Sequence, residues 1–133
     1  MSHYLLDTNI VSDIVRNPQG VVACKIAAIG ETEIATSIIV AAELRFGAEK
    51  RGSPKLSAQL QAVLDVLPIL PLSEGADVQY AILRAQLERD DTPIGGNDML
   101  IAAHALAMDS ILVTDNVREF ERVNELRIEN WLR

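Results

Sequence analysis

Short, largely apolar segments alternate with longer amphipathic segments along this chain, and this alternation constrains the fold more than any other feature. The short apolar segments are rich in branched aliphatic residues, which is typical of buried strands. Strands that alternate with helices form a mainly parallel sheet with helices on both faces. The sequence therefore predicts the α/β class, as a three-layer α/β/α arrangement, with strands at residues 4–6, 33–36, 69–70, 111–114 and 126–128.

Capping residues and breakers mark the ends of the helices. Ser37 and Ser73 are typical N-cap residues, and Pro18 suits the first turn of a helix. The sequence Gly-Ser-Pro at residues 52–54 breaks the chain between two helices. On these signals we expect a short helix near Phe120 and longer helices over residues 10–16, 18–30, 37–48, 56–67, 73–87 and 97–108.

The composition indicates a single domain with an aliphatic core. The chain has 133 residues, of which 49% are apolar and only 4% aromatic. The single cysteine, Cys24, excludes an internal disulfide and a cysteine-based zinc site. The start reaches Asp7 after few apolar residues, and the apolar run 99–108 is interrupted by His104. We therefore expect one soluble, cytoplasmic domain over residues 1–133, without a secretory signal or membrane span.

The formal net charge of −7 bears on nucleic-acid binding but does not by itself decide the function. Proteins that bind the duplex backbone are usually basic. A metal-dependent nuclease tolerates an acidic total, because its carboxylates hold the metal. The charge also indicates a basic or mixed-charge partner.

Four acids lie where predicted elements begin or end. Asp7 and Asp115 directly follow strands, Glu43 lies about two turns into a helix, and Asp98 opens another helix. In an open parallel sheet, functional sites form at the carboxyl ends of the strands. Asp7 and Asp115 also suit turns, and Asp98 also suits a helix N-terminus. Glu43 stands among Ala and Leu, where a carboxylate needs a partner.

Converging carboxylates repel one another unless a cation lies among them. Ligand sets made only of oxygen suit Mg²⁺ or Mn²⁺. Such an ion can activate water and stabilise charge on a phosphoryl oxygen. The spacing is therefore compatible with a metal-dependent phosphodiesterase, and equally with the structural explanation that each acid has.

Several motifs resemble the PIN-domain family in order along essentially the whole chain. They are LLDTN at 5–9, AAELRFGA at 41–48, TPIGGND at 92–98 and IAAHA at 101–105. The later motifs VTDN at 113–116, REF at 118–120 and ENW at 129–131 resemble the C-terminal part of VapC toxins.

The resemblance implies a parallel sheet flanked by helices and an Mg²⁺- or Mn²⁺-dependent endoribonuclease site. It implies an RNA substrate, often a structured tRNA, and inhibition by a cognate VapB antitoxin. It also implies a homodimer, and contact with operator DNA only indirectly, through the antitoxin.

The same resemblance assigns the site residues. Asp7, Glu43 and Asp98 match the first three acids of the family, and Asp7 and Asp98 are expected to bind the metal directly. Glu43 binds the metal directly or through water, or orients the attacking water. The fourth position is Asp115 or Asn116, because the last acid falls one place later in some relatives; Asn116 would coordinate through its amide oxygen.

Other polar residues have two explanations each. Thr8 and Asn9 steady Asp7 or cap the next helix. His104 lies in an apolar helix, which favours a hydrogen-bonded core residue over a catalytic one. Four cations after Glu43 favour a solvated helix end, with RNA phosphate contacts as the alternative: Arg45, Lys50, Arg51 and Lys55.

Other functional classes fit the sequence less well. A phosphoacceptor receiver domain needs a lysine after a later strand, whereas the last lysine is Lys55. A phosphatase with an aspartate nucleophile carries a second acid two places on, where this chain has Asn9. A degenerate binding module would not keep the first three acids. The remaining alternative is a PIN nuclease that works in RNA processing rather than as a toxin.

Overall fold

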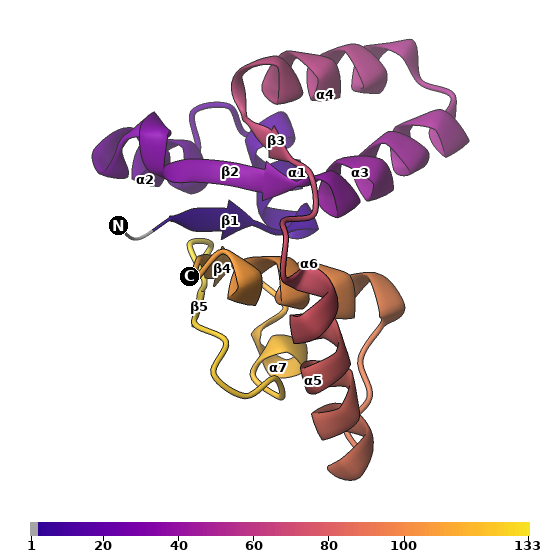
Figure 1. Cartoon of the computed structure of the whole chain (residues 1–133). Coiled ribbons are helices and arrows are strands. Elements are labelled where there is room, and N and C mark those ends of the chain that lie inside the picture. The colour runs from indigo at the N-terminus through magenta and orange to yellow at the C-terminus, as the bar shows by residue number, and fades with distance from the viewer. Residues whose placement is uncertain (1–2) are drawn as a thin grey trace.

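Five short strands form the central sheet in the computed structural model, which describes residues 3–133 (Figure 1). All neighbouring strands are parallel, in the order β3-β2-β1-β4-β5. The predicted α/β class with a parallel sheet is therefore confirmed. The strands are β1 (Tyr4–Leu6), β2 (Ile34–Ser37), β3 (Ile69–Leu70), β4 (Ile111–Val113) and β5 (Ile128–Glu129).

The first strand of the chain lies at the centre of the sheet. Leu5 pairs with Ala35 of β2 on one side and with Leu112 of β4 on the other. Leu5 is completely buried, as expected for a strand covered on both faces. Because both neighbours run parallel to β1, the residues that follow β1 and β4 meet at one edge of the sheet.

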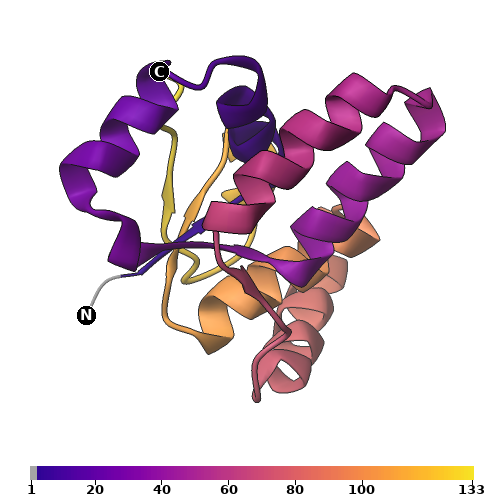
Figure 2. The same ribbon diagram turned by 90° about the horizontal axis from the view of Figure 1, so that it is seen from above.

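The helices cover the sheet in two groups (Figures 1 and 2). The first four helices of the chain pack together beside β1, β2 and β3, and the last three lie beside β4 and β5. A 3₁₀ turn, Glu31–Glu33, leads into β2. The helices are α1 (Thr8–Arg16), α2 (Val21–Ile29), α3 (Ile38–Arg51) and α4 (Pro54–Val66), then α5 (Ala76–Arg89), α6 (Gly96–Ala107) and α7 (Val117–Phe120).

Two of the predicted helix starts are set by serine caps. The Ser37 hydroxyl accepts a hydrogen bond from the Ile39 amide at 3.1 Å, and the Ser53 hydroxyl accepts one from Leu56 at 3.2 Å. The first of these caps fixes the start of α3, the helix that carries Glu43. Every helix within residues 3–133 is too short or too polar to cross a membrane.

Two other helix starts differ from the prediction. The second helix begins at Val21 rather than Pro18, because a turn closed by Gly20 N–H and Asn17 C=O comes first. The fifth begins at Ala76 rather than at Ser73, because Gly75 has a φ of 93° and interrupts the chain before the helix. The last strand is also shifted, to Ile128–Glu129.

Candidate active site

Asp7 lies at the carboxyl end of the central strand and is only 4% exposed. Its backbone N–H donates to Val113 C=O, which fixes it beside the end of β4. The Thr114 hydroxyl donates to Asp7 Oδ2 at 2.7 Å, and Thr114 is itself fully buried. The Asp7 carboxylate is therefore held in one position by two adjacent strands.

Glu43 projects from α3 toward the same edge and is held by neutral donors. The Thr8 hydroxyl donates to Glu43 Oε1 at 2.9 Å, and the Asn97 amide donates to Oε2 at 3.3 Å. Thr8 also lies 3.5 Å from Asp7 Oδ1, a much weaker contact. These bonds supply the partner that a carboxylate among Ala and Leu requires.

Asp98 and Glu119 form the other side of the site. Asp98 lies in the first turn of α6, and Glu119 lies in α7. Glu119 accepts hydrogen bonds from the Gly95 amide at 2.9 Å and the Asn116 side chain at 2.6 Å. Sequence analysis did not identify Glu119, because its position in a short helix follows no acid pattern of its own. The position became evident only from its contacts with segments far away in the chain.

The pKa values show that these acids interact. Burial, a hydrogen bond to Glu119 and the charges of Glu119, Asp7 and Glu43 together raise the pKa of Asp98 to about 7. Burial acts to raise the pKa of Glu119, but hydrogen bonds from Gly95, Asn116 and Asp98 outweigh it and lower that pKa. One proton is thus shared between Asp98 and Glu119 near neutral pH. Burial also raises the pKa of Asp7, and the charge of Glu43 adds to this effect.

Asp115 and Asn116 are placed differently from each other. Asp115 Oδ1 accepts from the Asn130 side chain at 2.9 Å and pairs with Arg133 Nε at 3.1 Å. These contacts hold Asp115 against the C-terminal segment and not against Asp7, Glu43 or Asp98. Asn116 reaches the site through its amide group, which donates to Glu119.

Two of the remaining predicted polar residues, Asn9 and His104, are accounted for by local contacts. Asn9 Oδ1 accepts from the Asp115 amide at 3.0 Å, so it braces the loop after β4. His104 is fully buried with Nδ1 2.9 Å from the Ser37 hydroxyl, and burial lowers its pKa. The prediction that His104 is a hydrogen-bonded core residue is confirmed.

The site offers only oxygen donors, which suits a hard divalent cation. Among residues 3–133, no three acidic, histidine or cysteine side chains are already positioned to coordinate one ion. Burial is the main cause of the raised pKa values of Asp7 and Asp98, and the charges of neighbouring acids add to it, so a bound cation would favour the ionised carboxylates. The donor chemistry therefore fits a divalent metal, once the carboxylates rotate toward it.

We expect divalent cations to bind more tightly as the pH rises from 6 to 8. Asp98 must lose the proton it holds with a pKa of about 7 before its carboxylate can bind an ion. Below that pKa, affinity should fall by up to about tenfold per pH unit. Isothermal titration of Mn²⁺ at pH 6, 7 and 8 measures this. The Asp98→Asn variant should show a flatter pH profile, and equal affinity of the unmodified chain at pH 6 and 8 would contradict the expectation.

A central parallel sheet with one acid directly after β1 and others on α3, α6 and α7 at its carboxyl edge is the arrangement of a PIN domain. The PIN-domain sequence pattern matches residues 4–126, so the chain belongs to the PIN-domain family. Within this family it belongs to the VapC group, as its relatives show. It is 40% identical to Ribonuclease VapC2 of Rickettsia felis, over 96% of this chain and 97% of that protein.

Two further relatives agree with this placement. The chain is 33% identical to the tRNA(fMet)-specific endonuclease VapC of Shigella flexneri, over 98% of this chain and 99% of that protein. The crystal structure of DNA-bound VapBC from Salmonella typhimurium matches with a TM-score of 0.86 at 33% identity, over 98% of this chain and 99% of that one. The predicted resemblance to VapC toxins is therefore confirmed.

Proposed function

We propose that this chain is the toxin of a VapBC-type pair: an endoribonuclease that hydrolyses RNA phosphodiester bonds and is inhibited by a VapB-type antitoxin. One observation carries the proposal. Asp7, Glu43, Asp98 and Glu119 come from four different elements, yet the charges of the other three all raise the pKa of Asp98. Such mutual repulsion is expected at a site that binds a cation. The names of the relatives, which are ribonucleases and endonucleases, support the RNA substrate.

Mg²⁺ or Mn²⁺ is the proposed cofactor, with Asp7, Asp98 and Glu119 as the residues that hold it. When bound, the ion supplies Lewis-acid stabilisation of the charge that develops on the phosphoryl group. Thr114 keeps Asp7 pointed into the site, and the Gly95 amide does the same for Glu119. Glu43, held by Thr8 and Asn97, is positioned to accept a proton from the attacking water.

Glu119 takes the fourth acidic position in this proposal, in place of Asp115. Glu119 shares a hydrogen bond with Asp98, whereas the Asp115 carboxylate is paired with Arg133 and Asn130. Asn116 acts through Glu119, to which it donates, rather than as a ligand. Asp115 then serves to anchor the C-terminal segment beside the site.

The partners follow from the relatives. The Salmonella structure is a DNA-bound VapBC complex, so we place a VapB-type antitoxin on this chain and operator DNA on the antitoxin. The net charge of −7 suits a basic or mixed-charge partner. The tRNA-specific relative makes tRNA the first substrate to test. A homodimer and a cytoplasmic location complete the proposal.

Cleavage of total bacterial RNA by the purified, antitoxin-free chain tests this function. The reactions contain Mn²⁺, Mg²⁺ or EDTA, beside an Asp7→Ala protein prepared in the same way. Discrete fragments that require metal and vanish with Asp7→Ala are expected, and mapping their ends identifies the substrate. Intact RNA under every condition, from protein shown to be folded, would overturn the proposal.

A further inference from the structure

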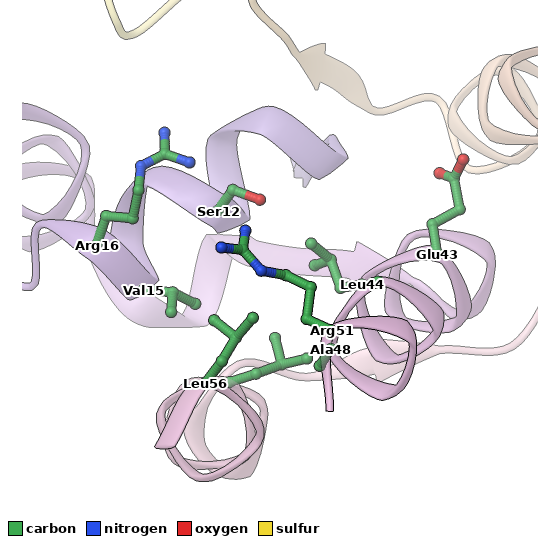
Figure 3. Close-up of a pocket in the computed structure, with 10 residues that line it drawn as sticks. Ser12, Val15, Arg16, Glu43, Leu44, Ala48, Arg51 and Leu56 are labelled. Carbon is green, nitrogen blue, oxygen red and sulfur yellow. The ribbon is translucent and has the colours of Figure 1, made fainter. Parts of the chain in front are cut away.

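We propose that Arg16, Gly47 and Arg51 form a subsite that holds an RNA phosphate next to the one being cleaved. The inference rests on the ribonuclease function proposed above. It concerns a groove between α1, α3 and α4 with a volume of about 240 Å³. Figure 3 shows the Arg51 guanidinium over the middle of this groove, with Arg16 at one end and Glu43 at the other.

One face of α3 connects the acidic site to this groove. Glu43, Gly47 and Arg51 are spaced at i, i+4 and i+8, so they form one stripe along the helix. Eight residues of α-helix span about 12 Å. Arg51 is therefore placed for a neighbouring nucleotide of a strand whose scissile phosphate lies at Glu43.

Gly47 is a glycine that the fold itself does not require. It lies in the interior of α3, where glycine is less stable than alanine. A Cβ atom at this position would meet no atom within 4 Å, so close packing does not explain it either. The missing side chain keeps the groove open between Glu43 and Arg51, which allows a ligand to pass close to the helix backbone.

The acidic charge of the chain favours a local cationic subsite for RNA. A net charge of −7 and a cluster of carboxylates both repel RNA, so the strand needs cations close to the site. Among residues 3–133, the side chains of Arg16 and Arg51 have no hydrogen bond or ion pair, and guanidinium groups bind phosphate in a bidentate manner. Four other arginines are engaged by Gln61, Glu88, Asp109 and Asp115, and Arg122 donates to the Pro93 carbonyl: Arg45, Arg84, Arg127 and Arg133 are the four. Within residues 3–133, Arg89 and Arg118 lack such a partner as well, but neither lines this groove.

Filter binding of radiolabelled bulk bacterial tRNA to the full chain in EDTA tests the subsite without cleavage. The Arg16→Gln/Arg51→Gln double variant should bind about tenfold more weakly at 100 mM KCl. The slope of log affinity against log salt should also fall by about 1, because the contact with one phosphate is lost. Arg89→Gln, an exposed arginine on α5, is the matched control and should leave both quantities unchanged.

The Gly47→Ala variant tests whether Gly47 keeps the groove open for RNA or only serves the structure of α3. A purely structural glycine in open space predicts an equal or higher Tm and unchanged tRNA binding. Our proposal predicts an equal or higher Tm together with several-fold weaker binding and a raised KM for cleavage of the same tRNA in Mn²⁺.

The outcomes distinguish this inference from the proposed function. If the unmodified chain cleaves RNA but the arginine and glycine variants keep their affinity and salt slope, the subsite is wrong and the ribonuclease stands. If the variants lose affinity only for the antitoxin, the groove is a polypeptide site and the RNA subsite is also wrong. If the unmodified chain cleaves no RNA, the proposed ribonuclease function is wrong, and the subsite that rests on it is wrong as well.

Discussion

Replacing Asp98 by asparagine is expected to abolish RNA cleavage while making the cation-free protein more stable. The activity loss follows from the removal of a metal-binding carboxylate and should be at least about 10²-fold. The stability gain follows from the raised pKa of Asp98, about 7 in the folded protein against 3.8 for an ordinary aspartate. Between these two values the folded state holds the extra proton, so its stability falls as the pH rises.

The asparagine side chain removes this penalty because it carries no charge. Asp98 is only half-buried, so the gain is on the order of 1 kcal/mol at pH 7.5, which corresponds to a Tm higher by about 3–5 °C. Melting curves in EDTA at pH 7.5 and pH 5 measure it, and the gain should shrink at pH 5, where Asp98 is already protonated. Normal cleavage by this variant would remove Asp98 from the ligand set. A lower Tm at pH 7.5 would contradict the electrostatic explanation.

The second large effect is expected from Glu119→Gln, in comparison with Asp115→Asn. Glu119→Gln should reduce metal-dependent cleavage by about 10²-fold, because it removes the carboxylate that interacts with Asp98. Asp115→Asn keeps the oxygen that accepts from Asn130 and loses only an exposed pair with Arg133. Exposed pairs of this kind contribute about 0–1 kcal/mol, so its activity should change by less than about fivefold.

Both variants are compared by initial cleavage rates at pH 7.5 across a titration of Mn²⁺. Glu119→Gln should also require a higher Mn²⁺ concentration for half-maximal rate, whereas Asp115→Asn should not. The reverse order of the two losses would return the fourth acidic position to Asp115.

The parts of the fold that depend on local chemistry were predictable from the sequence. The strands at 4–6 and 69–70 coincide with apolar runs, and Ser37 caps the helix that it precedes. Helix starts that depend on an unusual backbone conformation were not predictable. The φ of 93° at Gly75 delays α5, although Ser73 is an equally good cap by its chemistry.

Within the proposed site, three of the four acids were expected from the sequence. Asp7, Glu43 and Asp98 follow from the alternation of strands and helices together with the family resemblance. Glu119 depends on the Gly95 amide, 24 positions away, and on Asn116. Asp115 stands at the expected end of β4, but Asn130 and Arg133 engage its carboxylate. Contacts between residues that are distant in the chain produce no periodic sequence pattern, so they could not be predicted.

The central place of β1 also determines when a growing chain becomes a nuclease. This strand needs β4, which begins more than a hundred residues later at Ile111, to complete its pairing. Closing such a long loop is slow and must wait for translation of the later segment. A nascent chain that ends before residue 119 lacks an acid of the proposed site as well as a completed central sheet. The acidic site can therefore form only after synthesis has passed residue 119 and β4 has paired with β1.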